Sequence, residues 1–402
     1  MTPDGWGPVR LSEVADQRTE KALPMETDAR AYVALEHLAQ GSPTLLGWSR
    51  AGTATSAKTK FRAGDVLFGK LRPYLRKAAP APFDGLCSTD ILPLFGRDQL
   101  DTRYLAQLGQ WRPLQRHAVA TSSGTKMPRT SWAKLGEFQF SLPPLQEQRK
   151  IAAILASVDN AIKQTQAVID QVGTVRQALV HELLSHGLSG RHGKKKGTVV
   201  GRIPDTWDIV RLGDVVSLPR GQKNPTKGPY RNWPLVAPNH VESGTGRLLR
   251  IETALEQNAK SGKYAVAPGD VVYSKIRPYL RKAVVATFRG LCSADMYPLR
   301  PKARVDSRFL LAVLLSGRFT DFANSLSTRT GIPKINREQL GSYVLAMPPA
   351  KEQKRMVRCF VSLDQRGETE VSKKEQLLRV KSALMSVLLT GELRVTPDPE
   401  PA

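Results

Sequence analysis

Two copies of a short basic segment carry the residues best suited to bind a polyanion. The segment reads KLRPYLRK at Lys70–Lys77 and KIRPYLRK at Lys275–Lys282, so cations and a tyrosine are grouped around a proline. Lysine binds a phosphate as a point charge, whereas the flat arginine fork matches a phosphate or a base edge. The residues predicted to contact nucleic acid are Lys70, Arg72, Tyr74, Arg76, Lys77, Lys275, Arg277, Tyr279, Arg281 and Lys282.

The near-identity of the two copies indicates what they bind. A residue set that is kept in both halves serves a feature that both targets share, which in DNA is the sugar-phosphate backbone. We therefore expect these residues to anchor the backbone and to support the framework. The alternative is a structural hairpin whose tyrosine is buried in the core and whose cations face water.

The charge balance indicates the same class of partner. The chain has 402 residues with 60 Lys and Arg against 36 Asp and Glu, a formal net charge of +24. A basic surface binds phosphates and releases counterions, so nucleic acid is favoured over an anionic membrane. No apolar run is long enough to span a bilayer, and no signal sequence is found. We expect a cytoplasmic protein, and the widely separated Cys87, Cys292 and Cys359 argue against a disulfide framework or a zinc site.

An internal repeat organises the chain. At an offset of 205 residues, Gly64–Leu94 matches Gly269–Leu299 with 20 identities in 31 positions. The match extends in both directions with small shifts, so nearly the whole chain is a tandem duplication. The length alone also favours two domains.

Between the matched frameworks lie segments that differ. They are residues 17–25, 41–55, 217–232 and 244–256. A shared frame with different inserts suggests one task performed on two targets, and the alternative is drift of unselected loops. Base reading is expected in the inserts, because polar side chains there would form bidentate base contacts. The candidates are Ser49, Arg50, Gln222, Lys223, Asn224 and Arg231. Lys126 and Lys334 lie in turn-like segments that are either DNA-facing loops or simple connectors.

A long helix is predicted after each proline pair, because apolar residues recur in alternating steps of four and three. These seam residues are Ile151, Leu155, Val158, Ile162, Ile169, Val172, Leu179, Leu183, Met356, Phe360, Leu363, Leu377, Leu384 and Leu388. Gly367 and Lys374 interrupt the second seam, so we expect a weaker second helix. The simplest cover for each stripe is the other helix, packed antiparallel with the globular domains at opposite ends. In the alternative, each helix packs back on its own domain.

The expected fold class is α+β with internal pseudo-two-fold symmetry, because short apolar runs broken by Gly and Pro precede each helix. The expected segments are a first domain at 1–143, a helix at 144–187, a basic linker at 188–206, a second domain at 207–348, a helix at 349–391 and a disordered tail at 392–402.

Catalytic motifs are not found in the sequence. A methyltransferase acting on a base amino group needs a [DNS]PP[YFW] motif, but the proline pairs read LPPL and MPPA. A GxxxxGK[ST] phosphate loop is also missing. We expect no catalytic residue, metal site or cofactor in this chain.

In combination, the motifs resemble a known family. The run GD-V-K-RPYLRK-FxGLCS-D, then PPxxEQ and a long helix, all duplicated, resembles the specificity subunits of type I restriction-modification systems. The resemblance implies two target-recognition domains, each reading one half of a bipartite site in double-stranded DNA. It also implies that the paired helices form an antiparallel coiled coil that sets the gap and docks two methyltransferase subunits.

The same resemblance places the chemistry on partners. The methyltransferase subunits would carry S-adenosylmethionine and methylate adenine, and a restriction subunit, if one joins, would use ATP and Mg²⁺. Two other classes stay open at this point: a nonenzymatic RNA-binding scaffold and a nuclease with an unrecognised site.

Overall fold

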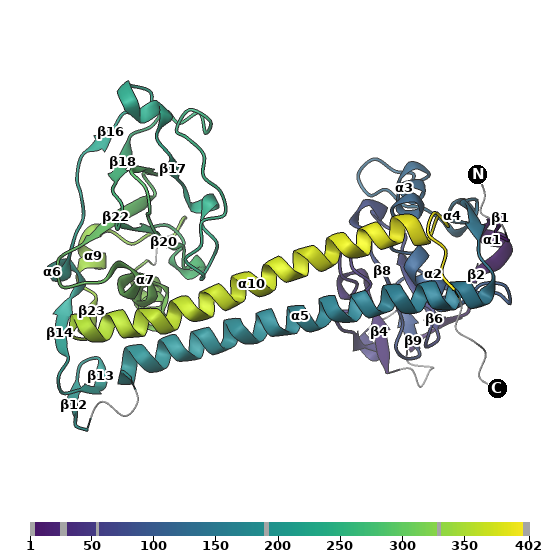
Figure 1. Ribbon diagram of the computed structural model, residues 1–402, viewed down its shortest axis with the longest axis horizontal. Coiled ribbons are helices and arrows are strands. Elements are labelled where there is room, and N and C mark those ends of the chain that lie inside the picture. Colours follow the sequence, from purple (N-terminus) through teal and green to yellow (C-terminus); the bar gives the residue numbers. More distant parts are fainter. Residues whose placement is uncertain (1–4, 25–29, 54–55, 189–192, 328–330, 397–402) are drawn as a thin grey trace. The chain divides into compact units, whose positions relative to one another are not determined.

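The computed structural model describes residues 5–24, 30–53, 56–188, 193–327 and 331–396. The chain divides into two compact units, whose elements are labelled in Figure 1. Unit 1 contains Met1–Ala167 and Val371–Ala402, and unit 2 contains Val168–Glu370. Each unit therefore combines a globular domain with a part of each long helix. No helix in the described ranges is both long and apolar enough to cross a membrane.

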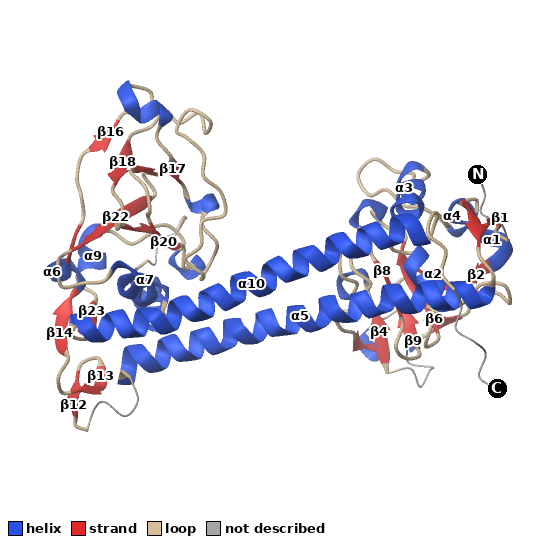
Figure 2. Cartoon of the chain, viewed as in Figure 1, coloured by secondary structure: helices blue, strands red, loops and turns tan. Residues whose placement is uncertain are grey.

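The domain of unit 1 is built from short strands and short helices, which Figure 2 distinguishes. Its described strands form sheets in the orders β2-β10-β7-β8, β3-β6-β9-β4-β5 and β1-β11. The strands are β1 (Gly7–Arg10), β2 (Ala15–Gln17), β3 (Lys21–Ala22), β4 (Ala31–Val33), β5 (Ser49–Arg50), β6 (Lys58–Phe61), β7 (Val66–Gly69), β8 (Ala78–Pro80), β9 (Gly85–Cys87), β10 (Ile91–Gly96) and β11 (Gln139–Leu142). The helices and 3₁₀ turns are α1 (Leu11–Val14), η2 (Leu35–His37), η3 (Ala51–Thr53), η4 (Pro73–Leu75), α2 (Thr102–Leu108), α3 (Arg112–Ala120) and α4 (Trp132–Gly136).

The domain of unit 2 has the corresponding sheets in the orders β15-β22-β19-β20, β16-β18-β21-β17 and β14-β23, together with the pair β12-β13. The strands are β12 (Lys195–Thr198), β13 (Gly201–Pro204), β14 (Asp208–Arg211), β15 (Val216–Ser217), β16 (Gln222–Lys223), β17 (Leu235–Val236), β18 (Lys263–Val266), β19 (Val271–Ser274), β20 (Ala283–Val285), β21 (Gly290–Cys292), β22 (Met296–Pro301) and β23 (Val344–Met347). The helices and 3₁₀ turns are α6 (Leu212–Val215), η5 (Gly228–Asn232), η6 (Pro238–His240), η7 (Pro278–Leu280), α7 (Ser307–Leu315), α8 (Gly317–Leu326) and α9 (Arg337–Gly341).

The duplicated sequence folds in the same way twice. In unit 1, β7 pairs with β10 in the register Gly69↔Ile91, and in unit 2, β19 pairs with β22 in the register Ser274↔Met296. Both β7 and β19 are buried along their whole length. The predicted α+β duplication is therefore confirmed.

A buried aspartate follows the glycine of the repeated Gly-Asp pair in both domains. Asp65 is 2% exposed and forms an ion pair with Arg18, whereas Asp270 is 1% exposed and pairs with Arg300. A buried carboxylate is strongly destabilising once its cation is removed. The ion pair is present in both copies. Its arginine belongs to β22 in unit 2 and directly follows β2 in unit 1.

The two long helices are α5 (Leu145–His186) and α10 (Ala350–Leu388). In unit 1, Lys381 Nζ donates to Asp159 Oδ1 at 2.6 Å, and Lys374 Nζ donates to Gln166 Oε1. The residue number rises along α5 while that of its partner falls along α10. The helices therefore pair antiparallel in this unit.

The helix α10 continues through Gly367 and Lys374, the two residues that interrupt its apolar seam. In unit 2, a Cβ on Gly367 would lie 3.7 Å from Val172 Cγ1, so the glycine faces α5. Arg176 donates to Asp364 in the same unit, again in antiparallel order. Polar residues in the seam thus find partners on the opposite helix.

The predicted seam residues lie at buried or half-buried positions of both helices. In unit 1, Ile151 and Leu155 of α5 join the domain core together with Leu388 of α10. In unit 2, Leu183 of α5 and Phe360 of α10 do the same. Each domain core is therefore completed by both helices, which combines the two alternatives left open by the sequence.

Residues 188–206, expected to be a basic linker, contain the hairpin of β12 and β13. Ile203 is 2% exposed within the core of unit 2, and Arg318 donates to Val200 O at 2.6 Å. The lysines dominate the composition of this segment, but its apolar residues Leu188, Val200 and Ile203 pack against the core of unit 2.

The tail expected to be disordered at 392–402 is ordered where it begins. Arg394 forms an ion pair with Glu147 at 2.8 Å, and Val395 packs against the core of unit 1. Residues 397–402 of that segment lie outside the described residues.

Candidate nucleic-acid interface

Each RPYL segment forms a tight turn with a left-handed residue at both ends. Arg72 (φ 50°) and Arg76 (φ 51°) flank η4, while Arg277 (φ 48°) and Arg281 (φ 47°) flank η7. Among the non-glycine residues that the structure describes, Asn258 alone shares this conformation. A left-handed backbone costs an L-residue about 1–2 kcal/mol, and such strain concentrates at functional sites.

A second loop is fastened to each turn. Arg72 N donates to Pro128 O at 2.7 Å, and Arg277 N donates to Pro333 O at 2.8 Å. The loop cations that come beside the turns are the predicted Lys126 and Lys334, both exposed. The structure thus brings together residues that lie about 55 positions apart in each sequence half.

The tyrosine of each turn is directed to solvent. Tyr74 is 51% exposed and Tyr279 is 54% exposed, whereas Pro73 and Pro278 are buried. The alternative of a buried core tyrosine is therefore wrong. A half-exposed phenol between arginines offers a hydroxyl and a ring face to a ligand.

The last lysine of each segment is engaged within the domain. Lys77 Nζ donates to Leu35 O at 2.6 Å, and Lys282 Nζ donates to Pro238 O at 2.7 Å. These contacts fasten the turn to the loop that follows β4 or β17, and we leave both lysines out of the interface. The first lysines, Lys70 and Lys275, are half-buried at the ends of β7 and β19.

The second arginine of each turn lies over a glycine at the start of a segment that differs between the halves. A Cβ on Gly41 would lie 3.1 Å from Arg76 Nη2, and one on Gly244 would lie 3.2 Å from Arg281 Nη2. The backbone of each glycine also donates to the carbonyl of its arginine at 3.0 Å. The turn, which is identical in both halves, therefore fixes the position at which the divergent segment begins.

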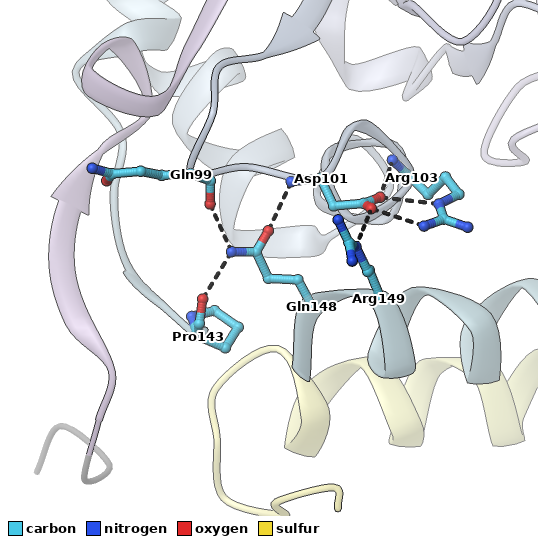
Figure 3. A network of polar contacts seen from close by, with 6 residues as sticks. All are labelled: Gln99, Asp101, Arg103, Pro143, Gln148 and Arg149. Carbon is cyan, nitrogen blue, oxygen red and sulfur yellow. Dashed lines mark hydrogen bonds and ion pairs between the residues drawn. The ribbon is translucent and has the colours of Figure 1, made fainter. Parts of the chain in front are cut away.

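The PPxxEQ motif joins each domain to its long helix. Gln148 Nε2 donates to Gln99 O and Pro143 O, both at 2.8 Å, and Gln148 Oε1 accepts from Asp101 N at 2.9 Å. Figure 3 shows this network, in which Arg149 also pairs with Asp101. The second copy of the glutamine repeats these contacts within unit 2.

The glutamate of the motif binds the indole at the start of its domain. Trp6 Nε1 donates to Glu147 at 3.0 Å, and Trp207 Nε1 donates to Glu352 at 3.1 Å. Burial pushes the pKa of Glu147 upward, but the guanidinium of Arg394 and the Trp6 indole outweigh it and lower the pKa below its usual value. The motif is thus structural, and it fixes the domain relative to the start of the helix in each unit.

The comparison with known families agrees with the duplication. The model of the type I restriction modification DNA specificity domain matches residues 3–173 and 204–379, each match ending within a long helix. The chain belongs to this family.

Relatives of this specificity-domain chain carry matching descriptions. The type I restriction enzyme EcoDI specificity subunit of Escherichia coli is 31% identical over 295 residues, which cover 67% of this chain and 66% of the relative. The MjaVIII specificity subunit of Methanocaldococcus jannaschii is 26% identical over 290 residues, covering 68% and 66%. The matched region thus spans 66% of the length of both relatives.

Two solved structures share the fold of this specificity-domain chain. A chain from a structure on complex assembly and conformational transition of the type I R-M system gives a TM-score of 0.61 at 21% identity, covering 98% of this chain and all of that chain. The type I restriction-modification S subunit from M. genitalium gives 0.56 at 13% identity, with 98% and 100% covered.

Two arginines beside the first turn were missed by the sequence interpretation. Arg112 and Arg116 of α3 line a hollow of about 350 Å³ together with Tyr74 and Arg76. The matching positions in the second domain are Gly317 and Asp321, so the repeat gave no signal. In the first specificity domain, two further arginines thus lie beside the turn.

The polar cluster predicted in the second specificity domain lies on β16, on η5 and in the loop between them. In the sequence, this cluster precedes the turn at η7 by more than 40 residues. Gln222, Lys223, Asn224 and Arg231 are exposed, as a reading surface requires. Asn224 Oδ1 also accepts from the backbone and hydroxyl of Thr226, at 2.9 and 2.8 Å, so this side chain also shapes the loop.

Proposed function

We propose that this chain is the DNA specificity subunit of a type I restriction-modification complex, in which each domain reads one half of a bipartite duplex site. The observation that carries the proposal is the recurrence of one strained, exposed, basic turn in both copies of a duplicated domain. Each turn adjoins a segment that differs between the copies. This arrangement suits a common backbone anchor beside a target-specific reader.

The cations of the turns are the proposed backbone contacts. Arg72, Arg76 and Arg277 are exposed, and Arg281 is half-exposed. A formal charge of +24 on the whole chain supports a polyanionic partner and predicts binding that weakens as salt rises. Duplex DNA is favoured over RNA because the family description specifies DNA.

The proposed partners of the helices are two methyltransferase subunits. The antiparallel pairing within each unit supports a role as a spacer that sets the gap between half-sites. The partners would supply S-adenosylmethionine, and a restriction subunit, if present, would supply ATP- and Mg²⁺-dependent steps. We further propose that the chain is a non-catalytic subunit that acts in the cytoplasm.

Coexpression with the methyltransferase subunit proposed as its partner tests this function. We expect the complex to methylate adenine within one bipartite sequence, read out by sequencing of modified bases, and the purified chain alone to transfer no methyl group. A complex that methylates without sequence preference, or a chain that acts alone, would contradict the proposal. A chain that binds RNA in preference to the duplex would support the scaffold class.

Exchange of Met1–Leu142 for the equivalent domain of a related chain tests the division of labour. One half of the methylated sequence should change while the other half is retained. If both halves change in a folded hybrid that still binds its partner, the two domains do not read independently.

A further inference from the structure

A broad groove in the first domain is lined in part by segments that differ between the two halves, at Gln17–Glu20 and at Trp48. We propose that it reads base edges in the major groove of duplex DNA, with Arg30 and Arg62 as guanine-reading residues. This inference rests on the proposed function and assigns the reading site of the first domain.

The groove has a volume of about 1110 Å³ and combines cations with aromatic rings. Trp48 is 50% exposed and packs edge-on against Phe83, with ring centroids 6.3 Å apart. The ring of Phe61 lies 6.1 Å from that of Phe83 and forms part of the floor, since Phe61 is buried. Apolar rings beside cations suit the mixed surface of base edges, where thymine presents a methyl group beside polar atoms.

Some charges that line the groove are neutralised within the domain. Arg18 forms the ion pair with the buried Asp65 and also lies over the ring of Phe95, 4.5 Å from its centroid. Lys60 pairs with Glu20 across the paired strands. These contacts shape the wall of the groove and leave these cations less available to a ligand.

Arg30 and Arg62 differ from the other cations of the groove. Both are exposed, and neither side chain has a hydrogen bond or ion pair with any residue that the structure describes. A guanidinium presents two parallel donors that match O6 and N7 of guanine. These two side chains therefore have the chemistry needed to read guanine, and within the described part of the chain no hydrogen bond or ion pair holds them away from a ligand.

The equivalent positions in the second domain differ in charge while the frame is kept. Phe83 and Gly85 of the groove correspond to Phe288 and Gly290. The positions of Arg30, Lys60, Arg62 and Asp84 are occupied in the second domain by Trp233, Ala265, Ala267 and Arg289. In that domain Arg289 lies over the Trp233 ring, 5.6 Å from its centroid. Two domains that read different DNA sequences would share the residues that form the groove and differ in the charged residues that line it.

The groove is connected to the backbone anchor by a single segment. That segment begins at Gly41, beneath the guanidinium of Arg76, and reaches Trp48 on the groove wall. An anchor that holds a phosphate would therefore fix the register of the DNA relative to the readers. In the chain, the two points are separated by the six residues 42–47.

The test uses the full chain in complex with its methyltransferase partner and compares Arg30→Ala, Arg62→Ala and the double variant with the wild type. We expect discrimination at guanine positions in one half-site to fall by about 10- to 100-fold, because that is the range for loss of one bidentate contact. The affected half-site should be the one that changes when Met1–Leu142 is exchanged. The matched control is Arg103→Ala, which removes a 73% exposed cation of the same domain outside the groove and should leave the sequence unchanged.

The second half-site serves as an internal control for folding and partner binding. An unchanged methylation sequence in the double variant would overturn the inference while leaving the proposed function intact. A uniform loss of affinity for all sequences would also overturn it, because it would assign both arginines to phosphates. A wild-type complex without any sequence preference would overturn both the proposed function and the inference.

Discussion

The four turn arginines occupy a backbone conformation that glycine adopts at much lower cost. Arg72 and Arg277 precede the proline of each turn, and Arg76 and Arg281 follow the leucine. The arginine side chain therefore contributes an interaction that offsets the strain of the backbone. Its retention in both copies agrees with a function that depends on the guanidinium rather than on the turn alone.

Substitution of glycine at two of these positions should separate stability from binding. In Arg72→Gly/Arg277→Gly, we expect each site to gain about 0.5–1 kcal/mol of stability, seen as a higher thermal unfolding midpoint. Binding to duplexes of any sequence should weaken, and each lost phosphate contact should reduce the logarithmic salt slope by about 0.9.

The control for this pair is Asn258→Gly, at the other described non-glycine residue with a positive φ. This variant should also be more stable but should bind DNA as the wild type does. Full affinity and an unchanged slope in the arginine variant would show that the turn cations do not contact phosphates.

Glu147 predicts a specific pH dependence of stability. Its pKa is lowered in the folded state, so its stabilising contribution is present above the unfolded-state pKa and is lost as the pH falls through the folded-state pKa. Glu147→Gln should lower stability at pH 7 by about 1–3 kcal/mol, because the charge-assisted bond from Arg394 is lost. Unfolding should be followed at pH 7 and pH 4.

The difference in stability between these pH values should be smaller in Glu147→Gln than in the wild type. Arg394→Ala is the matched variant, since it removes the cation and retains the Trp6 bond. Equal pH dependence in all three proteins would exclude Glu147 as the group responsible.

The long helices show which parts of an element a sequence pattern predicts and which it does not. The alternating steps of four and three located the seam on both helices, because burial of apolar side chains sets that period. The pattern failed at Gly367, Lys374 and Lys381, which occupy seam positions but are polar or lack a side chain. Their partners are more than 180 residues away in the sequence, and local periodicity contains no information about them.

The hairpin and the proposed reading groove were not predicted from the sequence, each for its own reason. Ile203 and Val200 pack the hairpin against the core of unit 2, and the lysine-rich composition of the segment concealed these contacts. The repeated turn was predictable since identity between copies marked it. Arg30 and Arg62 were not, because a reader that differs between copies leaves no repeat signal.

The buried pair of Lys381 and Asp159 tests the polar seam. Lys381 is 7% exposed, and its removal would leave Asp159 without its cation. We expect Lys381→Ala to destabilise the protein by about 1–3 kcal/mol. Asp159→Leu/Lys381→Leu should recover most of this loss, because a well-packed apolar pair often replaces a buried ion pair without cost. Thermal unfolding of both variants measures the two effects, and equal destabilisation by both would contradict the ion-pair interpretation.

At the level of the whole molecule, the spacer proposal makes a quantitative prediction. One heptad inserted after Gln171 and one after Glu368 keep the seam in phase and preserve the Gln166–Lys374 and Asp364–Arg176 contacts. Seven residues lengthen each helix by roughly 10 Å, which corresponds to about three base pairs.

Sites that this variant still methylates should contain both half-sequences and a longer gap. Total activity should fall, because three base pairs rotate one half-site by nearly a third of a turn about the DNA axis. A folded variant that retains the original gap would show that the helices do not measure DNA. A heptad inserted in α5 alone is the mismatched control and should disrupt pairing.

The completion of the first core by α10 has a consequence for synthesis of the chain. Leu155 belongs to a core cluster that can be completed only after Met385 and Leu388 have been synthesised. At 5–20 residues per second, translation of the intervening chain takes roughly 10–50 s. During that interval the apolar stripe of α5 emerges from the ribosome without its final cover. Early protection by a chaperone, or by an assembly partner already bound to the nascent chain, would therefore matter more for the first half of the protein than for the second.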